Sequence, residues 1–358
     1  MDANRALWLS TFVGVLGSGA WAQTLAQTAA QPSTQTPGPN AAVYAYKGAD
    51  RNARVLERAR QEGSVTVYTS LAPTEAAPLV EAFEKKYGIK VKLWRALSDG
   101  VVQRAVSEAR GKRHAVDVVE TNGPEMESLA REQVLAEFFS PFLADLPQAI
   151  IPKHGQWVPD RLNFFVVAYN TNKVKLADLP KTYEGFLDPK WKGRIALEAT
   201  DAEWMGAVVK TWGEARGMDF MNKLGAMKPD MRKGHVLLAQ LIASGEVEVG
   251  LTAYHANAQS FKKRGAPLDW APIEPVIARP QGLGLARHAP HPHAALLFAD
   301  FLLSPEAQDM LATMGRTPSS RLVKTDTSGM NYVMSDPAVT LDEADRWQLL
   351  WDKIFMAK

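Results

Sequence analysis

Hydroxyl side chains follow three short β-rich runs near the start of the sequence. Thr69 ends the first run and Ser70 follows it, Ser98 follows the second run and Thr121 follows the third. An amphipathic segment comes after each of these positions. Helix N-termini at such positions present free backbone N–H groups and partial positive charge, which suit an anionic or polar organic ligand. These residues are therefore candidate ligand contacts, although Ser98 is more often a plain helix N-cap than a ligand contact.

Acidic and aromatic side chains follow the later runs. Asp201, Glu203 and Trp204 begin the helix that is expected after one run, and Tyr254 and His255 follow another. Trp204 suits stacking on a ligand but is also typical of a core residue. The two carboxylates disfavour an anion and favour a donor-bearing or metal-containing ligand. Tyr254 is the leading candidate, because the strand before it should end at a ligand-binding edge.

Enzyme motifs are missing from the sequence. The chain has no cysteine, no nucleophile elbow, no phosphate-binding loop and no H-E-x-x-H zinc motif. His288, His291 and His293 lie within six residues and two of them suit a transition metal, whereas the prolines between them indicate a surface loop. The sequence therefore favours a binding protein without a cofactor over an enzyme.

The N-terminus is typical of an exported protein. Arg5 precedes an apolar stretch at 6–20 and an A-x-A pattern at 20–22, which predict a signal peptide over residues 1–22. Residues 23–42 are mostly Gln, Thr, Ala, Pro and Gly, and we expect a flexible leader there. With 41 basic and 39 acidic residues, the chain has no charge excess suited to nucleic acid.

The remaining 300 or so residues alternate between β-rich runs and amphipathic segments, which predicts an α/β fold with a mostly parallel sheet. A length of this size favours two lobes. Strands are expected at 64–69, 89–94, 116–120, 163–169, 194–198 and 247–252. The main helices are expected near 74–87, 98–109, 126–135, 202–212, 235–244, 256–264, 292–303 and 305–314.

An ordered set of segments resembles the periplasmic solute-binding proteins of the ferric-iron-binding-like cluster, which have the type II periplasmic binding protein fold. No single segment is specific, but the set covers most of the chain from Gly63 to Ser320. The matching segments are 63–70, 79–91, 117–121, 166–174, 187–197, 243–254, 265–270 and 292–320.

The resemblance implies two α/β lobes, each a mixed, mostly parallel sheet flanked by helices, joined by crossover strands near 160–165 and 276–281. The lobes are expected at 43–162 plus 277–358 and at 163–276. The ligand is expected in the cleft between the lobes, and closure over it strengthens polar contacts by removing water. A monomer in the periplasm, served by permease and ATPase subunits of an ABC importer in the inner membrane, is implied as well.

Arg161 and Asn163 lie on the first expected crossover. An arginine there suits a bidentate contact with a carboxylate or phosphonate, or a pair with a local acid. Both residues are candidate ligand contacts.

Ferric-ion members of the family hold the metal with two adjacent tyrosines, a histidine and a glutamate, and such oxygen donors suit a hard trivalent cation. Here Ala253 precedes Tyr254, so one tyrosine of the pair matches. Glu120 is available as an acid, although the family's acidic position matches Asn122 more closely. Tyr254 is thus the candidate ligand for ferric iron, and ferric iron, an iron chelate and a small organic anion all stay open as the transported ligand.

Two other classes of protein fit the same features. A periplasmic sensor would present its ligand to a membrane receptor, and a neighbouring permease gene would argue against it. A secreted hydrolase would turn its ligand over.

Overall fold

The computed structural model describes residues 37–356, so the expected signal peptide and the leader up to residue 36 lie outside the described residues. Helix α1 (Ala41–Tyr44) begins within the range expected for the leader. The Asn40 side chain donates a hydrogen bond to the Ala289 carbonyl at 2.9 Å. The predicted flexible leader is therefore wrong for its last six residues, because this contact and the helix hold them on the fold.

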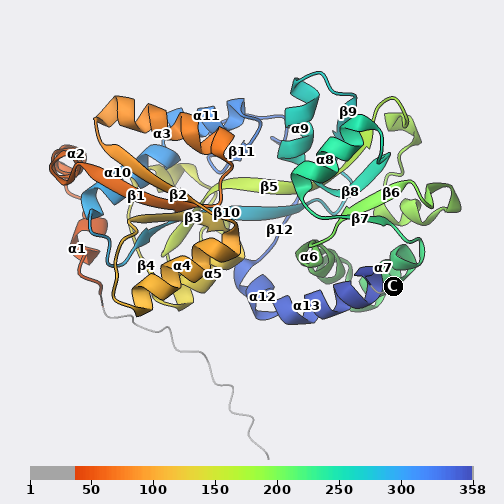
Figure 1. Cartoon of the computed structure of the whole chain (residues 1–358), viewed down its shortest axis with the longest axis horizontal. Helices are drawn as coiled ribbons and strands as arrows, with labels where there is room; N and C mark the ends of the chain where they lie inside the picture. Colours follow the sequence, from red (N-terminus) through yellow and green to blue (C-terminus); the bar gives the residue numbers. More distant parts are fainter. Residues whose placement is uncertain (1–36, 357–358) are drawn as a thin grey trace, which may run out of the picture. The chain divides into compact units, whose positions relative to one another are not determined.

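Three parallel strands at one end of the sheet match the first three expected runs. Their spatial order is β2-β1-β3. Gly88, in the left-handed conformation at φ 74°, ends the helix that connects β1 to β2. The strands are β1 (Ser64–Thr69), β2 (Lys90–Arg95) and β3 (Val118–Asn122). The helices packed around them in Figure 1 are α2 (Arg51–Glu62), α3 (Pro73–Tyr87), α4 (Ser98–Arg110), α5 (Gly123–Arg131), α10 (Pro292–Leu303) and α11 (Pro305–Thr313).

Two long antiparallel strands continue the sheet through its middle, β5 (Trp157–Asn170) and β10 (Ile277–Ala286). Strand β10 pairs with β3 on one side and with β5 on the other. Strand β5 then pairs with β8 (Val249–Tyr254) and β9 (Leu268–Ala271). These strands lie where the crossovers were expected. Strand β5 starts six residues before its expected beginning, because the buried charges of Asp160 and Arg161 interrupt the apolar pattern that marks a strand.

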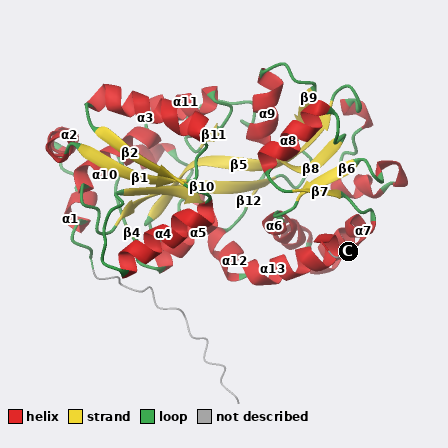
Figure 2. Cartoon of the chain, viewed as in Figure 1, coloured by secondary structure: helices red, strands yellow, loops and turns green. Residues whose placement is uncertain are grey.

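The second set of strands forms the other end of the sheet, in the order β5-β8-β6-β7 (Figure 2). Strand β6 is parallel to both of its neighbours, whereas β8 is antiparallel to β5, so the sheet is mixed. The strands are β6 (Ile195–Glu198), β7 (Asp230–Arg232), β8 (Val249–Tyr254) and β9 (Leu268–Ala271). The helices are α6 (Ala202–Trp212), α7 (Glu214–Ala226), α8 (His235–Ser244) and α9 (His255–Lys263).

Short elements complete the fold, and none was expected from the sequence because they have two to five residues and no periodic pattern. The two-residue strands are β4 (Leu135–Ala136), β11 (Thr317–Pro318) and β12 (Val333–Met334). The short helical turns are η1 (Pro141–Asp145), η2 (Gln148–Ile150), η3 (Leu176–Asp178), η4 (Tyr183–Leu187), η5 (Pro189–Trp191) and η6 (Asp352–Met356).

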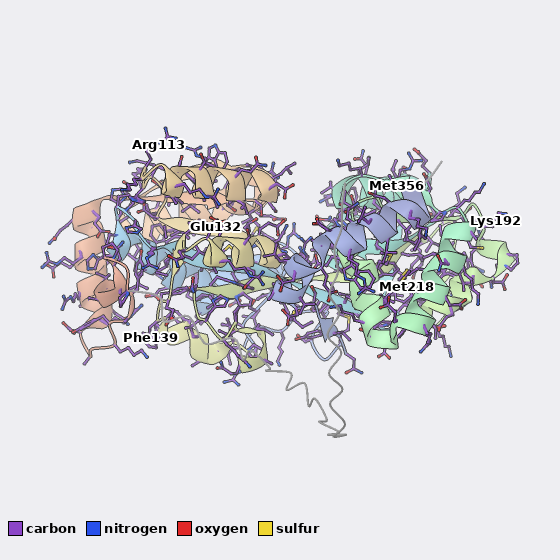
Figure 3. All side chains as sticks on the ribbon, turned by 90° about the horizontal axis from the view of Figure 1, so that it is seen from below. Arg113, Glu132, Phe139, Lys192, Met218 and Met356 are labelled. Carbon is purple, nitrogen blue, oxygen red and sulfur yellow. The ribbon has the colours of Figure 1, made fainter. Side chains whose placement is uncertain are left out.

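The C-terminal helices connect the two ends of the sheet. Helix α12 (Pro337–Asp342) contacts α5, and α13 (Ala344–Trp351) contacts α6. Figure 3 shows this segment from below, with Met356 near its end. Trp347 and Trp351 pack in the hydrophobic cluster that contains Trp204. The expected lobe boundaries stay a prediction, but α13 packs with the second lobe rather than with the first.

The core consists of separate hydrophobic clusters. The largest gathers residues such as Val67, Leu129 and Leu285 around the first set of strands, and the next surrounds the second set with residues such as Trp204 and Leu251. A small cluster that includes Leu162 and Ala278 lies on the two long strands between them. No helix within residues 37–356 is long and apolar enough to cross a membrane.

Candidate functional site

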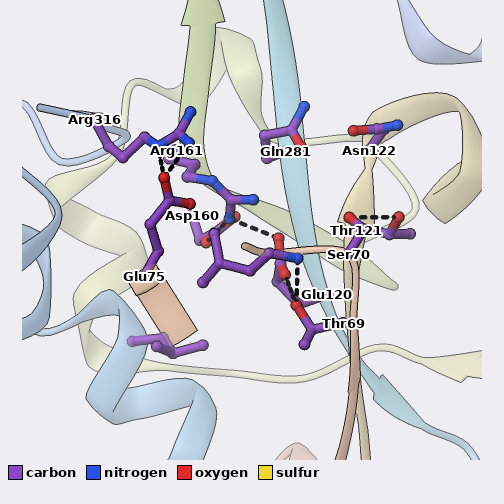
Figure 4. Close-up of polar contacts among 12 residues, drawn as sticks. Thr69, Ser70, Glu75, Glu120, Thr121, Asn122, Asp160, Arg161, Gln281 and Arg316 are labelled. Atoms are coloured by element: carbon purple, nitrogen blue, oxygen red, sulfur yellow. Dashed lines mark hydrogen bonds and ion pairs between the residues drawn. The ribbon is translucent and has the colours of Figure 1, made fainter. Parts of the chain in front are cut away.

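A buried network surrounds Arg161 at the carboxyl ends of the first strands, and Figure 4 shows its members. The Arg161 guanidinium donates to Glu120 at 2.6 Å and to Asp160 at 2.7 Å. The Thr69 hydroxyl donates to the other oxygen of Glu120 and accepts a hydrogen bond from the Leu71 backbone N–H at 2.9 Å. We call Thr69, Glu120, Asp160 and Arg161 the Arg161 network.

The Arg161 network is closed to solvent. Only 4% of the Arg161 side chain and 3% of the Glu120 side chain is exposed. Burial raises the pKa of Asp160 to about 6, although Arg161 opposes the shift. Burial lowers the pKa of Arg161, but Asp160 and Glu120 outweigh this effect and raise it. Arg161 therefore pairs with local acids, and its predicted contact with an anionic ligand is not available in this arrangement.

The other polar side chains after the first strands form two smaller contacts. The Thr121 hydroxyl donates to Ser70 at 3.1 Å. Asn122 donates to Ser98 at 2.7 Å and to Glu125 at 3.2 Å. The prediction that Ser98 caps its helix is wrong, because Leu97 holds the N-cap position and the Ser98 hydroxyl accepts from Asn122 instead.

A second arginine lies among residues from both ends of the sheet. Arg279 of β10 donates to the Tyr254 hydroxyl at 2.9 Å and pairs with Glu203 of α6 at 2.9 Å. Its other end lies 3.8 Å from Glu125 of α5, and Ser335 donates to Glu203 at 2.5 Å. We call Glu125, Glu203, Tyr254 and Arg279 the Arg279 network.

The Arg279 network is more open than the Arg161 network. The side chains of Arg279 and Glu125 are each 18% exposed. Burial nevertheless raises the pKa of Glu125, with Arg279 opposing the shift. Burial also raises the pKa of Tyr254, again against the effect of Arg279. The tyrosine therefore stays a neutral phenol at neutral pH.

Tyr254 is fixed by two aromatic neighbours. The ring of His235 stacks on it with the centroids 3.5 Å apart, and Phe165 meets it edge to face at 5.1 Å. His235 in turn pairs with Asp201 at 3.2 Å. These contacts place the predicted residues Asp201, Glu203 and Tyr254 in one neighbourhood.

Asn163 belongs to the same neighbourhood. It pairs with Arg279 across β5 and β10, and directly paired residues share a face of the sheet. Its side chain is buried, and its amide oxygen has no hydrogen-bond partner among the described residues. Asn163 therefore offers a free acceptor next to the Arg279 network.

Trp204 and His255 do not join this group. Trp204 is fully buried and meets the Tyr183 ring edge to face at 5.4 Å, so it is a core residue and does not stack on a ligand. His255 is 1% exposed and pairs with Asp326 at 3.2 Å. Adjacent residues at a helix start point in different directions, which explains why His255 separates from Tyr254.

Four residues of this neighbourhood were not selected from the sequence: Glu125, His235, Arg279 and Ser335. A signal existed for two of them, because Glu125 directly precedes the helix expected after the third strand and Arg279 lies on the second expected crossover. His235 begins an expected helix without any motif, and Ser335 lies in a C-terminal segment without a pattern. Their convergence depends on tertiary structure alone.

The three histidines near residue 290 and one cavity of the molecule do not belong to the Arg279 network. His291 pairs with Asp117 at 2.9 Å, His293 pairs with Glu62 at 2.8 Å, and His288 stacks on His114, so the three histidines have separate partners. A cavity of about 460 Å³ has walls that include Trp212, Arg216, Glu274 and Tyr332, and no predicted site residue lines it.

Comparison with known proteins identifies the family. Residues 68–309 match the model of the bacterial extracellular solute-binding proteins. Iron uptake protein A1 of Synechocystis is 25% identical over 292 residues, which cover 74% of this chain and 78% of the relative. A putative 2-aminoethylphosphonate-binding periplasmic protein of Salmonella typhimurium is 24% identical, with 76% and 81% covered. The crystal structure of iron-bound HitA from Pseudomonas aeruginosa superposes with a TM-score of 0.71 at 23% identity, covering 81% of this chain and 99% of HitA.

The chain belongs to the family of bacterial extracellular solute-binding proteins. The predicted type II periplasmic binding protein fold is confirmed by its structural neighbours. The predicted function class, a solute-binding component of an importer, is confirmed as well.

Proposed function

We propose that this chain captures a positively charged solute in the periplasm, without chemical turnover, and delivers it to the permease and ATPase of an ABC importer. The observation that carries the proposal is the Arg279 network. There a cationic group already lies between two carboxylates, Glu203 at 2.9 Å and Glu125 at 3.8 Å. The two acids belong to α6 and α5, helices whose apolar faces pack in different core clusters.

The charges around Tyr254 support a cationic solute. The two carboxylates of Glu125 and Glu203 outnumber the one guanidinium of Arg279. The free oxygen of Asn163 is an acceptor and also suits a donor-bearing solute. A free organic anion would meet net negative charge here, so this surrounding disfavours it.

In this proposal, capture of the solute depends on which cation pairs with Glu125 and Glu203. When the lobes part, Glu125 and Glu203 separate, and a cationic solute replaces part of the contact that Arg279 makes. When they close, water leaves and each charged contact becomes stronger. The solute stabilises the closed form only by the difference in its affinity for the two forms.

A thermal-unfolding screen tests the proposal. We expect a diamine, which carries positive charge alone, to raise the melting temperature, and free citrate and inorganic phosphate to leave it unchanged. A solute at about 100 times its Kd stabilises the folded state by about 2.7 kcal/mol. A response to the anions alone would overturn the charge assignment.

A matched pair of variants locates the solute. Glu203→Gln should weaken binding of the active solute at least about tenfold, because one of the two carboxylates loses its charge. Glu306→Gln is the control, because Glu306 is an exposed acid that pairs with Lys86 and takes no part in the Arg279 network. It should leave the affinity for the solute unchanged. Equal affinities of the two variants would place the solute elsewhere.

Ferric iron is a second candidate, favoured by the buried phenol of Tyr254 and by the iron-binding relatives. A ferric ion bound to this oxygen would displace its proton and give a visible charge-transfer band. The band should appear when iron is added to the wild-type protein and be lost in Tyr254→Phe. A colourless protein whose melting temperature does not respond to iron excludes this candidate.

A further inference from the structure

A group of metal-ligating side chains lies next to Tyr254. All of its members belong to the second set of strands and the helices that pack on it. Glu198 ends β6, Asp201 lies just before α6, and His235 begins α8. One potential ligand atom from each residue lies within 4.8 Å of the other two, and within residues 37–356 this is the one such group of three. None of the three matches the tyrosines, histidine and glutamate that the family resemblance implies for ferric iron.

Two atoms of this group are buried without a partner. Asp201 is 3% exposed, and its Oδ2 has no hydrogen-bond partner in the described part of the chain. The Nδ1 atom of His235 is likewise buried and unpartnered. The contact between His235 Nε2 and Asp201 Oδ1 at 3.2 Å leaves both of these atoms unsatisfied. A buried polar atom without a partner costs about 1–3 kcal/mol, so an ordinary ion pair does not account for the arrangement.

Glu198 is held in place but keeps room for a further contact. Its Oε1 accepts from the Gly234 backbone at 2.7 Å, and its Oε2 accepts from the backbone and hydroxyl of Thr200, both at 2.6 Å. A carboxylate has about four acceptor sites, so one remains on Oε1. The backbone contacts fix the carboxylate before any ion arrives, as the supporting contacts of metal ligands do.

We infer that Glu198, Asp201 and His235 form a binding site for a divalent transition-metal ion such as Zn²⁺ or Co²⁺. Two carboxylates and one imidazole nitrogen suit a first-row divalent ion, whereas Ca²⁺ and Mg²⁺ prefer oxygen ligands alone. The inference goes beyond the proposed function, because the site lies within one lobe and uses neither Glu125 nor Glu203. Since His235 stacks on Tyr254, an ion here also holds the tyrosine that faces the solute.

Cobalt is the probe that tests the site. Metal-free protein without a histidine tag is titrated with Co²⁺ while visible absorption is recorded, and Zn²⁺ binding is then measured by calorimetry. We expect one ion per chain, with Co²⁺ d–d bands that Zn²⁺ removes. Asp201→Asn and His235→Ala should each weaken Zn²⁺ binding at least about tenfold, because each removes one of three ligands.

His293→Ala is the matched control, because it removes a histidine from another histidine–carboxylate pair, with Glu62. It should bind Zn²⁺ as the wild-type protein does. If Asp201→Asn fails to fold, His235→Gln and the spectrum of the wild-type protein still decide the matter. No bands in the wild-type protein, or undiminished binding in the Asp201 and His235 variants, would overturn the inference. Solute binding that survives in Asp201→Asn but not in Glu203→Gln would separate this site from the proposed function.

Discussion

The Arg161 and Arg279 networks use the same chemistry in two different settings. Each places one guanidinium between two carboxylates and adds a hydroxyl-bearing side chain, Thr69 in the first and Tyr254 in the second. The first network joins residues of β1, β3 and β5 and is 3–4% exposed at its ion pairs. The second joins α5, α6, β8 and β10 and is 11–18% exposed at its ion pairs.

The difference shows how the same set of charges is sealed inside the structure in one place and left partly exposed in another. A network sealed inside one end of the sheet cannot exchange a partner without exposing buried charge, which is costly. A network that joins helices packed in different hydrophobic clusters can exchange a partner when those helices move apart. The two networks contain similar side chains, so their positions in the fold decide whether their charges can exchange a partner.

Removing the first arginine should have the largest effect on stability. Arg161→Met keeps most of the side-chain volume but leaves Glu120 and Asp160 as buried acids without a cation. We expect the free energy of unfolding to fall by about 3–5 kcal/mol, as when one partner of a buried pair is removed. Urea denaturation at neutral pH measures it.

Arg110→Met is the matched control for this change, because Arg110 pairs with Glu132 at the surface, where it is 70% exposed. Its loss should cost no more than about 1 kcal/mol. Similar losses in the two variants would mean that the Arg161 network is not the closed structural unit described above.

The pH dependence of stability should carry the signature of Asp160. Burial raises its pKa from 3.8 to about 6, so the folded state binds this proton more tightly than the unfolded state. Its contribution to stability is therefore largest below about pH 4, falls as the pH rises to about 6, and is constant above. The shift corresponds to at most about 3 kcal/mol.

Denaturation of the wild type and Asp160→Asn at several pH values between 4 and 7 measures this contribution. The wild-type free energy of unfolding minus that of the variant should decrease across the window, because asparagine does not titrate. A difference that stays constant or increases with pH would contradict the raised pKa.

The sequence predicts elements better than it predicts the site, and the reason is physical. Strand β1 coincides with its expected range because a run rich in β-branched and aromatic residues marks it locally. The start of β5 was missed because Asp160 and Arg161 resemble a loop until their buried pairing is known. Trp204 was a candidate for stacking because a helix start reveals a residue type but not the direction of its side chain.

The candidate site was predicted in part for the same reason. Asp201, Glu203 and Tyr254 follow strands, and the rule that ligands bind beyond strand ends selects them. His235 and Arg279 reach the site through a helix start and the middle of a long strand, which no local rule selects. The sequence thus predicts acids of the candidate site but not Arg279, the cation that lies between two of them.

Removing the second arginine should have the smallest effect on stability and separates the two networks most directly. In Arg279→Met, Glu125 and Glu203 lose their shared cation, but they are partly exposed and the raised pKa of Glu125 helps it to take up a proton. We expect a loss of about 1–2 kcal/mol, less than for Arg161→Met, because fewer charges are left buried and unpaired. Affinity for a cationic solute should increase, since the solute no longer competes with the guanidinium for the two carboxylates. Denaturation and calorimetric titration of both methionine variants test this, and a stability loss for Arg279→Met as large as for Arg161→Met, with unchanged affinity, would show that both networks are structural.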